Sequence, residues 1–567
     1  MNSLLAEKQK ELAGLIFPDV TETVEDLEKR YPKRDLGEGA CVTRFAPSPT
    51  GFLHTGALFT SLVNKLLAKQ SGGVFFLRIE DTDQKREVPG SVALFTKELA
   101  TFGLSPDEGV IAEGKEIGEY GPYTQSKRKD IYRICAKYLV EQGLAYPCFC
   151  TKEMKEKMRE MQEANKIIPG YYGVYAKCRN IAVEESIERV KKGEPYIVRF
   201  RSQGSHLKKM FFIDGARGKI EIAENDQDVV VIKADGLPTY HFAHVVDDHF
   251  MRTTHVVRGE EWISSTPVHI DLFHAMGFEE PIYVHVPLIM VKDGTSKRKL
   301  SKRKDKEAAV SYFLQAGYPP EAVMEYLRTL ANSDYEMWRN KNKEAKSSEF
   351  TFRLKKLSSA GSLLDIAKLN DISKEMIAKM DSVQVLEAVL AWSQIYQLKL
   401  YQLLKDNTDY ARQIFALERD NAKKIRKDIG KWEEILPNFF YFFKALLQAD
   451  IEQNGYAFDC LTTPDTATLS KEQTVAVLQA YLAAYDASLE KDAWFTQIKE
   501  IAESLGFCTN MKAYKQNPEN YVGSTADFTG VIRIALTNRH NTPDIYGIMQ
   551  ILGEEEVQSR LEKAASI

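Results

Sequence analysis

Two short segments far apart in the chain carry side chains suited to gripping a polyphosphate from two sides. The first, residues 44–57, places His54 where a turn rich in proline and glycine leads into a predicted helix, residues 54–70. The first N–H groups of a helix lack partners and attract phosphate, and an imidazole there can donate to a phosphate oxygen. Gly51 and Gly56 would let the backbone approach a ligand closely. An ordinary capping or core histidine is the competing interpretation.

The second segment, residues 292–306, is strongly basic, since eight of its fifteen residues are lysine or arginine. Such a run is usually a solvated loop or a nucleic-acid patch. It could also close over a polyphosphate and stabilise the charge that develops as pyrophosphate leaves. Chemistry at phosphorus needs positioning and cations more than a covalent side chain, which fits that interpretation. The basic residues are Lys292, Lys297, Arg298, Lys299, Lys302, Arg303, Lys304 and Lys306.

The elements around the first segment predict a parallel sheet. Residues 42–46 are a strand candidate ahead of the first helix, and the apolar residues 74–79 are a buried strand candidate. Helices are expected at residues 92–102 and 127–142. Strands that alternate with helices in this way form parallel sheets with right-handed crossovers.

This alternation is broken at residues 145–232 and ends beyond residue 287. The interruption contains a charged helix at residues 151–166, short strands and three of the seven cysteines, a pattern typical of an α+β insertion. The parallel pattern is expected to resume at residues 228–233 and 254–258. Elsewhere the sequence predicts helices at residues 3–30, 308–316 and 320–331, an exposed polar loop at 332–348 and mostly amphipathic helix over 373–567.

Composition narrows the class of protein further. With 567 residues the chain exceeds the size of one hydrophobic core, so three or more domains are expected. The net charge of −4 gives no global attraction to nucleic acid, and any polyanion must meet local basic patches. No apolar run approaches about 18 residues, and the first residues lack the pattern of a signal peptide. Seven cysteines argue against a disulfide scaffold and indicate a reducing compartment.

Several sequence blocks resemble the glutamyl branch of the class I aminoacyl-tRNA synthetases. Residues 44–56 are similar to its form of the HIGH motif, and residues 299–303 are similar to its KMSKS loop. The resemblance covers residues 41–563, because the end of the chain is similar to the end of that family's anticodon-binding region. The other matching blocks are residues 78–83, 121–128, 235–249, 258–265, 532–539 and 548–553.

The resemblance implies a ligase that activates glutamate with ATP to glutamyl-adenylate and transfers it to the 3′ end of tRNA(Glu). Arg44 and Arg258 are two cations suited to the substrate's side-chain carboxylate, and Glu80 suits its α-ammonium. The implied catalytic residues are His54, Lys299 and Lys302. The implied ATP contacts are His54, Gly56, Glu261, Lys299, Ser301 and Lys302, and the implied glutamate contacts are Arg44, Ala46, Ser48, Glu80, Tyr240, His244 and Arg258.

One departure from the family pattern affects amino-acid specificity. His244 stands where many glutamyl enzymes have asparagine, and this stretch is partly similar to the glutaminyl enzymes. Arg258 argues against glutamine, because a buried guanidinium would be left under-paired beside a neutral amide. Three alternatives stay open at this point: a non-discriminating form that also charges tRNA(Gln) with glutamate, a glutaminyl-tRNA synthetase, and a non-catalytic tRNA-binding relative.

Cys148, Cys150 and Cys178 suggest a structural Zn²⁺, which some family members carry in the insertion. A tetrahedral thiolate site needs four ligands, and the fourth is unclear. Tyr172 or Tyr175 could complete it, although a phenol with a pKa of about 10 is a poor ligand. The competing interpretation is three reduced cysteines in a small core.

A basic stripe is predicted in the C-terminal half. Arg419, Lys423, Lys427 and Lys431 are spaced to share one face of a helix. This face is either an ordinary solvent surface or a track for tRNA phosphates. Candidates for reading anticodon bases are Tyr546 and Arg539.

The expected organisation is α/β: a doubly wound parallel, Rossmann-type catalytic domain with an α+β insertion, followed by an all-α anticodon-binding region. We expect a cytoplasmic monomer, without membrane attachment, that binds tRNA(Glu), L-glutamate and ATP with Mg²⁺. The expected boundaries are an N-terminal helical extension at 1–40, catalytic halves at 41–144 and 233–286, an acceptor-end insertion at 145–232, a stem-contact region at 287–372 and the anticodon-binding region at 373–567.

Overall fold

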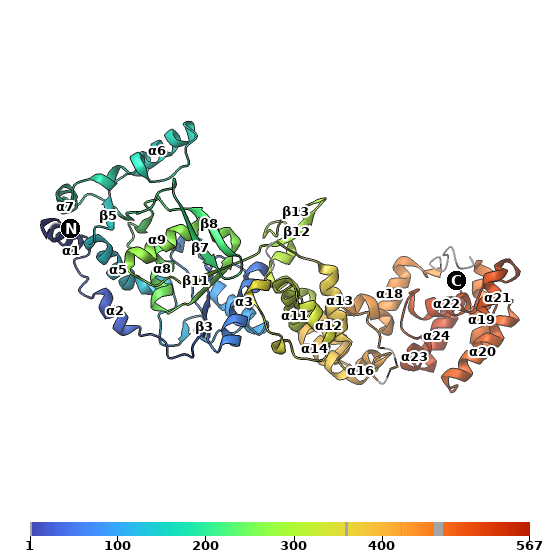
Figure 1. Cartoon of the computed structure of the whole chain (residues 1–567). Helices are drawn as coiled ribbons and strands as arrows, with labels where there is room; N and C mark the ends of the chain where they lie inside the picture. The colour runs from blue at the N-terminus through green and yellow to red at the C-terminus, as the bar shows by residue number, and fades with distance from the viewer. Residues whose placement is uncertain (1–2, 358–360, 421, 424, 459–468) are drawn as a thin grey trace. The chain divides into compact units, whose positions relative to one another are not determined.

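The chain divides into two units of internal contacts in the computed structural model (Figure 1). The first is Met1–Leu314 with Val323–Ile366, and the second is Gln315–Ala322 with Ala367–Ile567. The structure describes residues 3–357, 361–420, 422–423, 425–458 and 469–567. None of the helices described there combines the length and apolarity needed to cross a bilayer.

The first unit is built on a six-stranded sheet in the order β11-β10-β1-β2-β3-β4. All pairings are parallel except that of the edge strand β4, which confirms the predicted doubly wound sheet. Strands β2, β3 and β4 follow on one side of β1, and β10 and β11 are added later on its other side. The strand order therefore reverses between β1 and β10. The strands are β1 (Val42–Phe45), β2 (Val74–Leu77), β3 (Glu108–Ala112), β4 (Lys115–Ile117), β10 (His255–Gly259) and β11 (Ile282–Val286).

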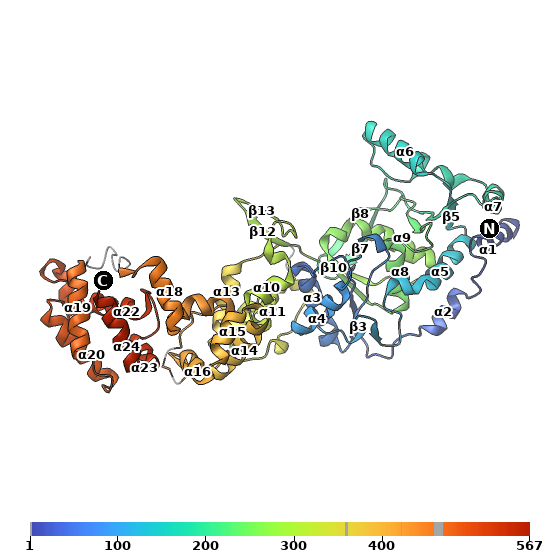
Figure 2. The same cartoon turned by 180° about the vertical axis from the view of Figure 1, so that it is seen from behind.

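Helices bury the sheet. α3 packs on β1, β2 and β10. In the same unit α5, α8 and α9 contact one another, as the two opposite views show (Figures 1 and 2). The central strands β1, β2, β10 and β11 are largely buried, as expected of a parallel sheet covered by helices. Charged residues at buried positions of these strands therefore need a partner. The helices are α3 (Thr55–Ser71), α4 (Ser91–Thr101), α5 (Lys129–Glu141), α8 (Tyr240–Phe250) and α9 (Thr266–Met276).

The predicted α+β insertion lies between α5 and α8, with one correction. Its sheet has the order β5-β6-β9, and β9 pairs antiparallel with β6. The prediction that residues 228–233 rejoin the parallel sheet is wrong, because an apolar run does not specify which sheet it joins. The elements are β5 (Ala145–Cys148), α6 (Lys152–Ala164), α7 (Val183–Lys191), β6 (Ile197–Phe200), β7 (Lys209–Asp214), β8 (Gly218–Ala223) and β9 (Val230–Ile232).

The two ends of the first unit are also ordered. The N-terminal helix α1 packs on α5 and α7, as expected of an amphipathic extension. Beyond the sheet, β12 and β13 form a hairpin that carries the basic segment. Residues 332–348 are not only loop, because α12 forms within them. The elements are α1 (Ser3–Ile16), α2 (Val24–Arg30), β12 (Ile289–Asp293), β13 (Ser296–Lys299), α12 (Tyr335–Lys341) and β14 (Ser362–Leu363), and α10 (Val310–Ala316) and α11 (Pro320–Ala331) each have residues in both units.

The second unit is helical with one apolar core, but the predicted basic stripe is not a helix. After α16 the chain from 417 to 431 is irregular where it is described, and Glu418 has a positive φ. Arg419 is buried and donates to the carbonyls of Ile377 and Met380. The helices are α13 (Ile366–Ile377), α14 (Ser382–Tyr396), α15 (Leu398–Lys405), α16 (Thr408–Ala416), α17 (Ile435–Phe439), α18 (Lys444–Asn454), α19 (Lys471–Ala484), α20 (Lys491–Ser504), α21 (Met511–Gln516), α22 (Thr525–Thr537), α23 (Ile545–Leu552) and α24 (Glu554–Ala565).

Candidate functional site

A cavity of about 1200 Å³ opens at the carboxyl ends of β1 and β10. These are the two strands between which the order of the sheet reverses, and such a switch point is where open α/β sheets bind ligands. Arg44 and Arg258 come from these two strand ends and both line the cavity. Two residues far apart in sequence therefore meet because their strands are neighbours.

Most of the predicted site residues line this cavity, and two do not. His244 is fully buried behind it, so its predicted direct contact with glutamate does not fit its position. Ser301 also stays outside, because its backbone N–H donates to Asp305 Oδ2 at 2.8 Å. The predicted residues that line the cavity are Arg44, Ala46, Ser48, His54, Gly56, Glu80, Tyr240, Arg258, Glu261, Lys299 and Lys302.

At one end of the cavity, His54 caps the start of α3. Its Nδ1 accepts a hydrogen bond from the Gly56 N–H at 2.9 Å, which leaves the ring proton on Nε2. Burial and the nearby charges of Lys302 and Lys299 lower the pKa of His54, so the ring is neutral and Nε2–H can donate. A Cβ on Gly56 would lie 3.1 Å from Nδ1, which explains the glycine.

The basic segment reaches the same end of the cavity. Lys302 Nζ lies 3.4 Å from the Phe52 carbonyl, and Lys299 Nζ lies 3.2 Å from Glu261 Oε1. Asp305 holds the loop by accepting two hydrogen bonds from Arg298, which lowers the pKa of Asp305 to about 2. Residues 44–57 and residues 292–306 thus contribute side chains to the same end of the cavity. We call the part lined by His54, Gly56, Lys299 and Lys302 the phosphate end.

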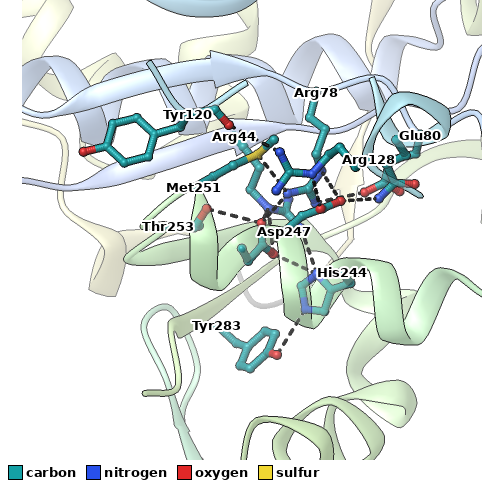
Figure 3. A network of polar contacts seen from close by, with 12 residues as sticks. Arg44, Arg78, Glu80, Tyr120, Arg128, His244, Asp247, Met251, Thr253 and Tyr283 are labelled. Atoms are coloured by element: carbon teal, nitrogen blue, oxygen red, sulfur yellow. Dashed lines mark hydrogen bonds and ion pairs between the residues drawn. The ribbon is translucent and has the colours of Figure 1, made fainter. Parts of the chain in front are cut away.

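We call the part of the cavity lined by Arg44, Glu80, Tyr240 and Arg258 the amino-acid end, after the role that the family resemblance predicts for these residues. Behind it lies a buried ion network of three guanidinium groups and three carboxylates among the described residues (Figure 3). Arg78 is wholly buried and donates to Asp248 at 2.7 Å and to Glu80 at 3.0 Å. The other members are Arg44, which donates to Asp248, and Arg128, which donates to Asp247.

Sequence analysis missed most of this network. The available signal was a set of charged residues inside apolar elements: Arg78 follows β2, and Asp247 and Asp248 interrupt the apolar face of α8. His244 belongs here too, since its Nδ1 lies 2.8 Å from Asp248 and its Nε2 3.2 Å from the Tyr283 hydroxyl. Burial lowers the pKa of His244 to about 3 despite Asp248, so the ring is neutral and adds no charge.

Arg258 differs from the other buried arginines of this region because no carboxylate among the described residues lies within ion-pair distance of it. The residue is only 6% exposed, and its guanidinium donates to neutral acceptors. The three positive and three negative groups of the network behind it pair with one another, and none of those carboxylates pairs with Arg258 at the cavity wall. The acceptors are His285 Nε2 at 3.0 Å, His269 Nδ1 at 3.1 Å, Thr266 Oγ1 at 2.8 Å and the Trp262 carbonyl at 3.3 Å.

The predicted cysteine cluster forms in the insertion. The sulfur atoms of Cys148, Cys150 and Cys178 lie within 4.8 Å of one another. The hydroxyl of Tyr171, not that of Tyr172 or Tyr175, lies 3.4 Å from Cys148 Sγ and 3.3 Å from Cys150 Sγ. Tyr172 instead donates to the Ile168 carbonyl. The tyrosine beside the cysteine sulfurs is therefore Tyr171, one residue before the predicted Tyr172.

Comparisons with known proteins agree with this geometry. Residues 40–371 match the family model of the catalytic domain of class I tRNA synthetases (E and Q), and residues 524–565 match an anticodon binding domain. A glutamate–tRNA ligase of Clostridium perfringens (strain SM101) is 48% identical over 97% of this chain and 98% of its own length. That of Acetivibrio thermocellus is 43% identical over 98% and 99%.

Solved structures show the same likeness. The crystal structure of a glutamate tRNA ligase from Elizabethkingia meningosepticum, in complex with its amino acid, superposes with a TM-score of 0.71. It is 27% identical, and the match covers 93% of this chain and 99% of that chain.

Proposed function

The chain belongs to the glutamate–tRNA ligase family of class I tRNA synthetases, and we propose that it carries out that family's reaction in the cavity between β1 and β10. The enzyme joins glutamate to the 3′ end of tRNA(Glu) at the expense of ATP. An oxygen of the glutamate α-carboxylate attacks the α-phosphorus of ATP, and the bond from that phosphorus to the β-phosphate oxygen breaks. The products of this first step are glutamyl-adenylate and pyrophosphate.

The phosphate end suits the ATP half of this step. The neutral His54 donates from Nε2, the start of α3 offers free N–H groups, and the cations of Lys299 and Lys302 face the leaving pyrophosphate. Glu261 also lines the cavity and is placed to bind the nucleoside. The Mg²⁺ that accompanies ATP arrives with the substrate and shares its phosphate charge.

The amino-acid end suits glutamate. The carboxylate of Glu80 is placed for the substrate ammonium, with Ser48 and the Ala46 backbone beside it on the cavity wall. Burial raises the pKa of Glu80, and a bound ammonium would favour its charged form. Arg44 and Arg258 are placed for the side-chain carboxylate, with the Tyr240 hydroxyl as a further donor.

One observation supports glutamate above other amino acids: among the described residues, no carboxylate contacts the Arg258 guanidinium directly. A carboxylate would balance the charge of Arg258 and accept its remaining N–H, whereas the neutral amide of glutamine would leave the buried cation unpaired.

In the second step a ribose hydroxyl of the terminal adenosine attacks the glutamyl carbonyl, and AMP leaves. The insertion is placed to hold the acceptor end and the helical unit to hold the anticodon.

Aminoacylation of separately purified tRNAs tests this proposal. The full chain should esterify glutamate to tRNA(Glu) and show ATP–pyrophosphate exchange that needs glutamate and tRNA. Esterification of glutamine would indicate the glutaminyl alternative, and glutamate on tRNA(Gln) would indicate a non-discriminating form. Absence of exchange would overturn the proposal and leave a tRNA-binding protein.

The cysteine cluster supports a structural Zn²⁺. Two Zn–S bonds of about 2.3 Å at the tetrahedral angle separate sulfur atoms by about 3.8 Å. The Cys150 and Cys178 sulfurs lie 3.6 Å apart, so the donors are spaced for one ion with Tyr171 as the fourth group. When bound, zinc would cross-link β5 to the turn at Cys178. Metal analysis of the purified chain should find about one zinc per chain, and C150S should lose it. Retention of zinc by C150S would contradict this assignment.

We further propose that the enzyme acts as a cytoplasmic monomer. Unpaired thiols throughout the described chain fit a reducing compartment. Light scattering on the purified protein should give the mass of one chain, 64.4 kDa. A mass of two chains would contradict the second half of this proposal.

A further inference from the structure

The guanidinium of Arg258 is held by a chain of contacts that begins outside the catalytic sheet. Asp214, the last residue of β7, accepts from His285 Nδ1 at 2.6 Å and from the His285 backbone N–H at 3.1 Å. On the other side of the ring, His285 Nε2 accepts from Arg258 Nε at 3.0 Å. All three side chains are buried, and His285 and Asp214 do not line the cavity.

The two partners of His285 determine its tautomer. A carboxylate at Nδ1 requires a proton there, and an arginine N–H at Nε2 requires a lone pair there. A protonated ring would place two N–H groups against each other. Burial and the charge of Arg258 lower the pKa of His285, so the ring stays neutral even though Asp214 opposes this shift. Asp214 therefore decides that His285 presents an acceptor to Arg258.

The hairpin that carries Asp214 is firmly seated on the sheet. Its Phe212 packs with Val256, Ile270 and Tyr283 in one apolar cluster. The N–H of Gly215 donates to the Tyr283 carbonyl at 2.8 Å. A Cβ on Gly215 would lie 2.9 Å from Val284 Cγ2, so the tip approaches β11 closely enough that any other residue would require the Val284 side chain to shift. Asp214 is thus fixed relative to β11 by packing as well as by hydrogen bonds.

The imidazole between Asp214 and Arg258 has an electrostatic consequence. A carboxylate in direct contact with Arg258 would offset its charge, in the way that Asp248 offsets part of the charge of Arg44 while it also pairs with Arg78. The His285 ring transmits the orientation fixed by Asp214 to Arg258. It also keeps the negative charge of Asp214 one side chain away from the guanidinium. Arg258 is therefore held rigidly yet stays positive at the cavity wall, which is what selection of an anionic side chain requires.

We propose that Asp214 and His285 are positioning residues that set the selectivity of the glutamate site through Arg258. The β7–β8 hairpin of the insertion then takes part in amino-acid selection as well as in the structure of the insertion. This inference rests on the proposed function, and it adds two residues that do not contact the substrate.

The substitution D214N tests the tautomer argument. Asparagine can still accept from the Ala216 and Arg217 N–H groups, as Asp214 Oδ1 does at 2.9 Å. Its NH₂ group would then take the place of Oδ2, which accepts from both Nδ1 and the backbone N–H of His285, so it would favour the wrong tautomer and lose the backbone contact. ATP–pyrophosphate exchange should show a rise of about tenfold or more in the KM for glutamate, with the KM for ATP changed less than about twofold. Discrimination of glutamate over glutamine should fall as well.

A pair of substitutions at His285 separates positioning from damage to the core. In H285Q the side-chain oxygen can reach the place of Nε2 and accept from Arg258, whereas in H285N it cannot. We expect H285Q to keep a KM for glutamate within about threefold of the wild type and H285N to raise it about tenfold. Equal effects of the two substitutions, or none from either, would overturn the proposal.

Asp228 is a matched control in the same insertion. It is as buried as Asp214 but accepts from the Arg179 guanidinium, the Ser202 N–H and the Tyr146 hydroxyl, away from Arg258. D228N should leave the KM for glutamate within about twofold. If wild-type protein shows no glutamate-dependent exchange, the proposed function fails. If the wild type is active and D214N has a normal KM for glutamate, only this inference fails.

Discussion

The two ends of the cavity use charge in opposite ways. At the amino-acid end, guanidinium and carboxylate groups are buried and hold one another through several hydrogen bonds (Figure 3). At the phosphate end, Lys299 and Lys302 reach into the cavity from a partly exposed hairpin and loop, and among the described residues each ammonium has a single polar contact, at 3.2 and 3.4 Å. The first arrangement is preorganised for one small ligand, and the second can adapt as phosphates move during the reaction.

Removal of Arg78, from the ion network at the amino-acid end, should have the largest effect of the substitutions that test this difference. R78M takes away the cation that both Asp248 and Glu80 contact and leaves buried negative charge uncompensated. Such a change costs about 3–5 kcal/mol of unfolding free energy, which denaturant unfolding of the full chain can measure. R298M, beside the phosphate end, removes the partly exposed pairs with Asp293 and Asp305 and should cost much less unfolding free energy. Similar losses of unfolding free energy in the two variants would show that the two ends do not differ in how they use charge.

Arg258 should give the next largest effect, in kinetics rather than stability. R258A removes the charge of this guanidinium and should lower kcat/KM for glutamate in the exchange reaction by about 10²–10³-fold. R258K keeps a charge but cannot donate to His285 and His269 together. Its kcat/KM for glutamate should therefore lie between those of the wild type and R258A. The KM for ATP should change little in both variants. A normal KM for glutamate in R258A would remove this arginine from the amino-acid end.

Lys302 tests the adaptable end. K302A should lower kcat for exchange by about 10–100-fold, because a cation is lost where pyrophosphate charge develops, and it should leave the KM for glutamate nearly unchanged. Arg303 is the matched control, since it belongs to the same loop but does not line the cavity. R303A should change exchange kinetics less than about twofold. A shift in the KM for glutamate caused by K302A would show that the two ends are coupled.

Sequence reasoning predicted elements better than their assembly. The strands that became β1 and β2 and the helix α3 follow from local hydrophobic patterns, and the family blocks then placed His54, Lys302 and Arg258 in one cavity. Residues 228–233 were assigned to the wrong sheet because an apolar run carries no information about its partner. The i, i+4 spacing of Arg419 and Lys423 suggested a helix, but the described residues of this stretch are not helical.

The contacts that hold Arg258 could not be predicted for the same reason. Asp214 and His285 lie on different strands, and they meet only because Gly215 lets the hairpin tip approach β11. That contact depends on how two separate sheets dock, which a single sequence does not specify. The charged residues inside apolar elements did indicate a buried ion network, since a buried Arg78 or Asp248 always needs partners.

Glu98 offers the smallest and most selective test, because it is a buried charge without compensation behind the phosphate end. Its carboxylate is 2% exposed, and among the described residues neither oxygen makes a well-aligned hydrogen bond, although the Leu53 N–H favours the anion. Burial raises the pKa of Glu98 from 4.5 to about 7. The folded chain therefore keeps a proton that the unfolded chain releases. The stability it contributes is fully present below pH 4.5 and is lost as the pH rises through about 7.

The substitution E98Q keeps the neutral form at every pH. Its unfolding free energy should equal that of the wild type near pH 5 and exceed it by on the order of 1 kcal/mol at pH 8. The matched control E113Q changes an exposed carboxylate and should show no difference between the two pH values. A stability gain that is equal at both pH values would point to better packing instead of a buried charge. The phosphate end would then contain no uncompensated carboxylate, and only its two lysines would distinguish it from the balanced network at the amino-acid end.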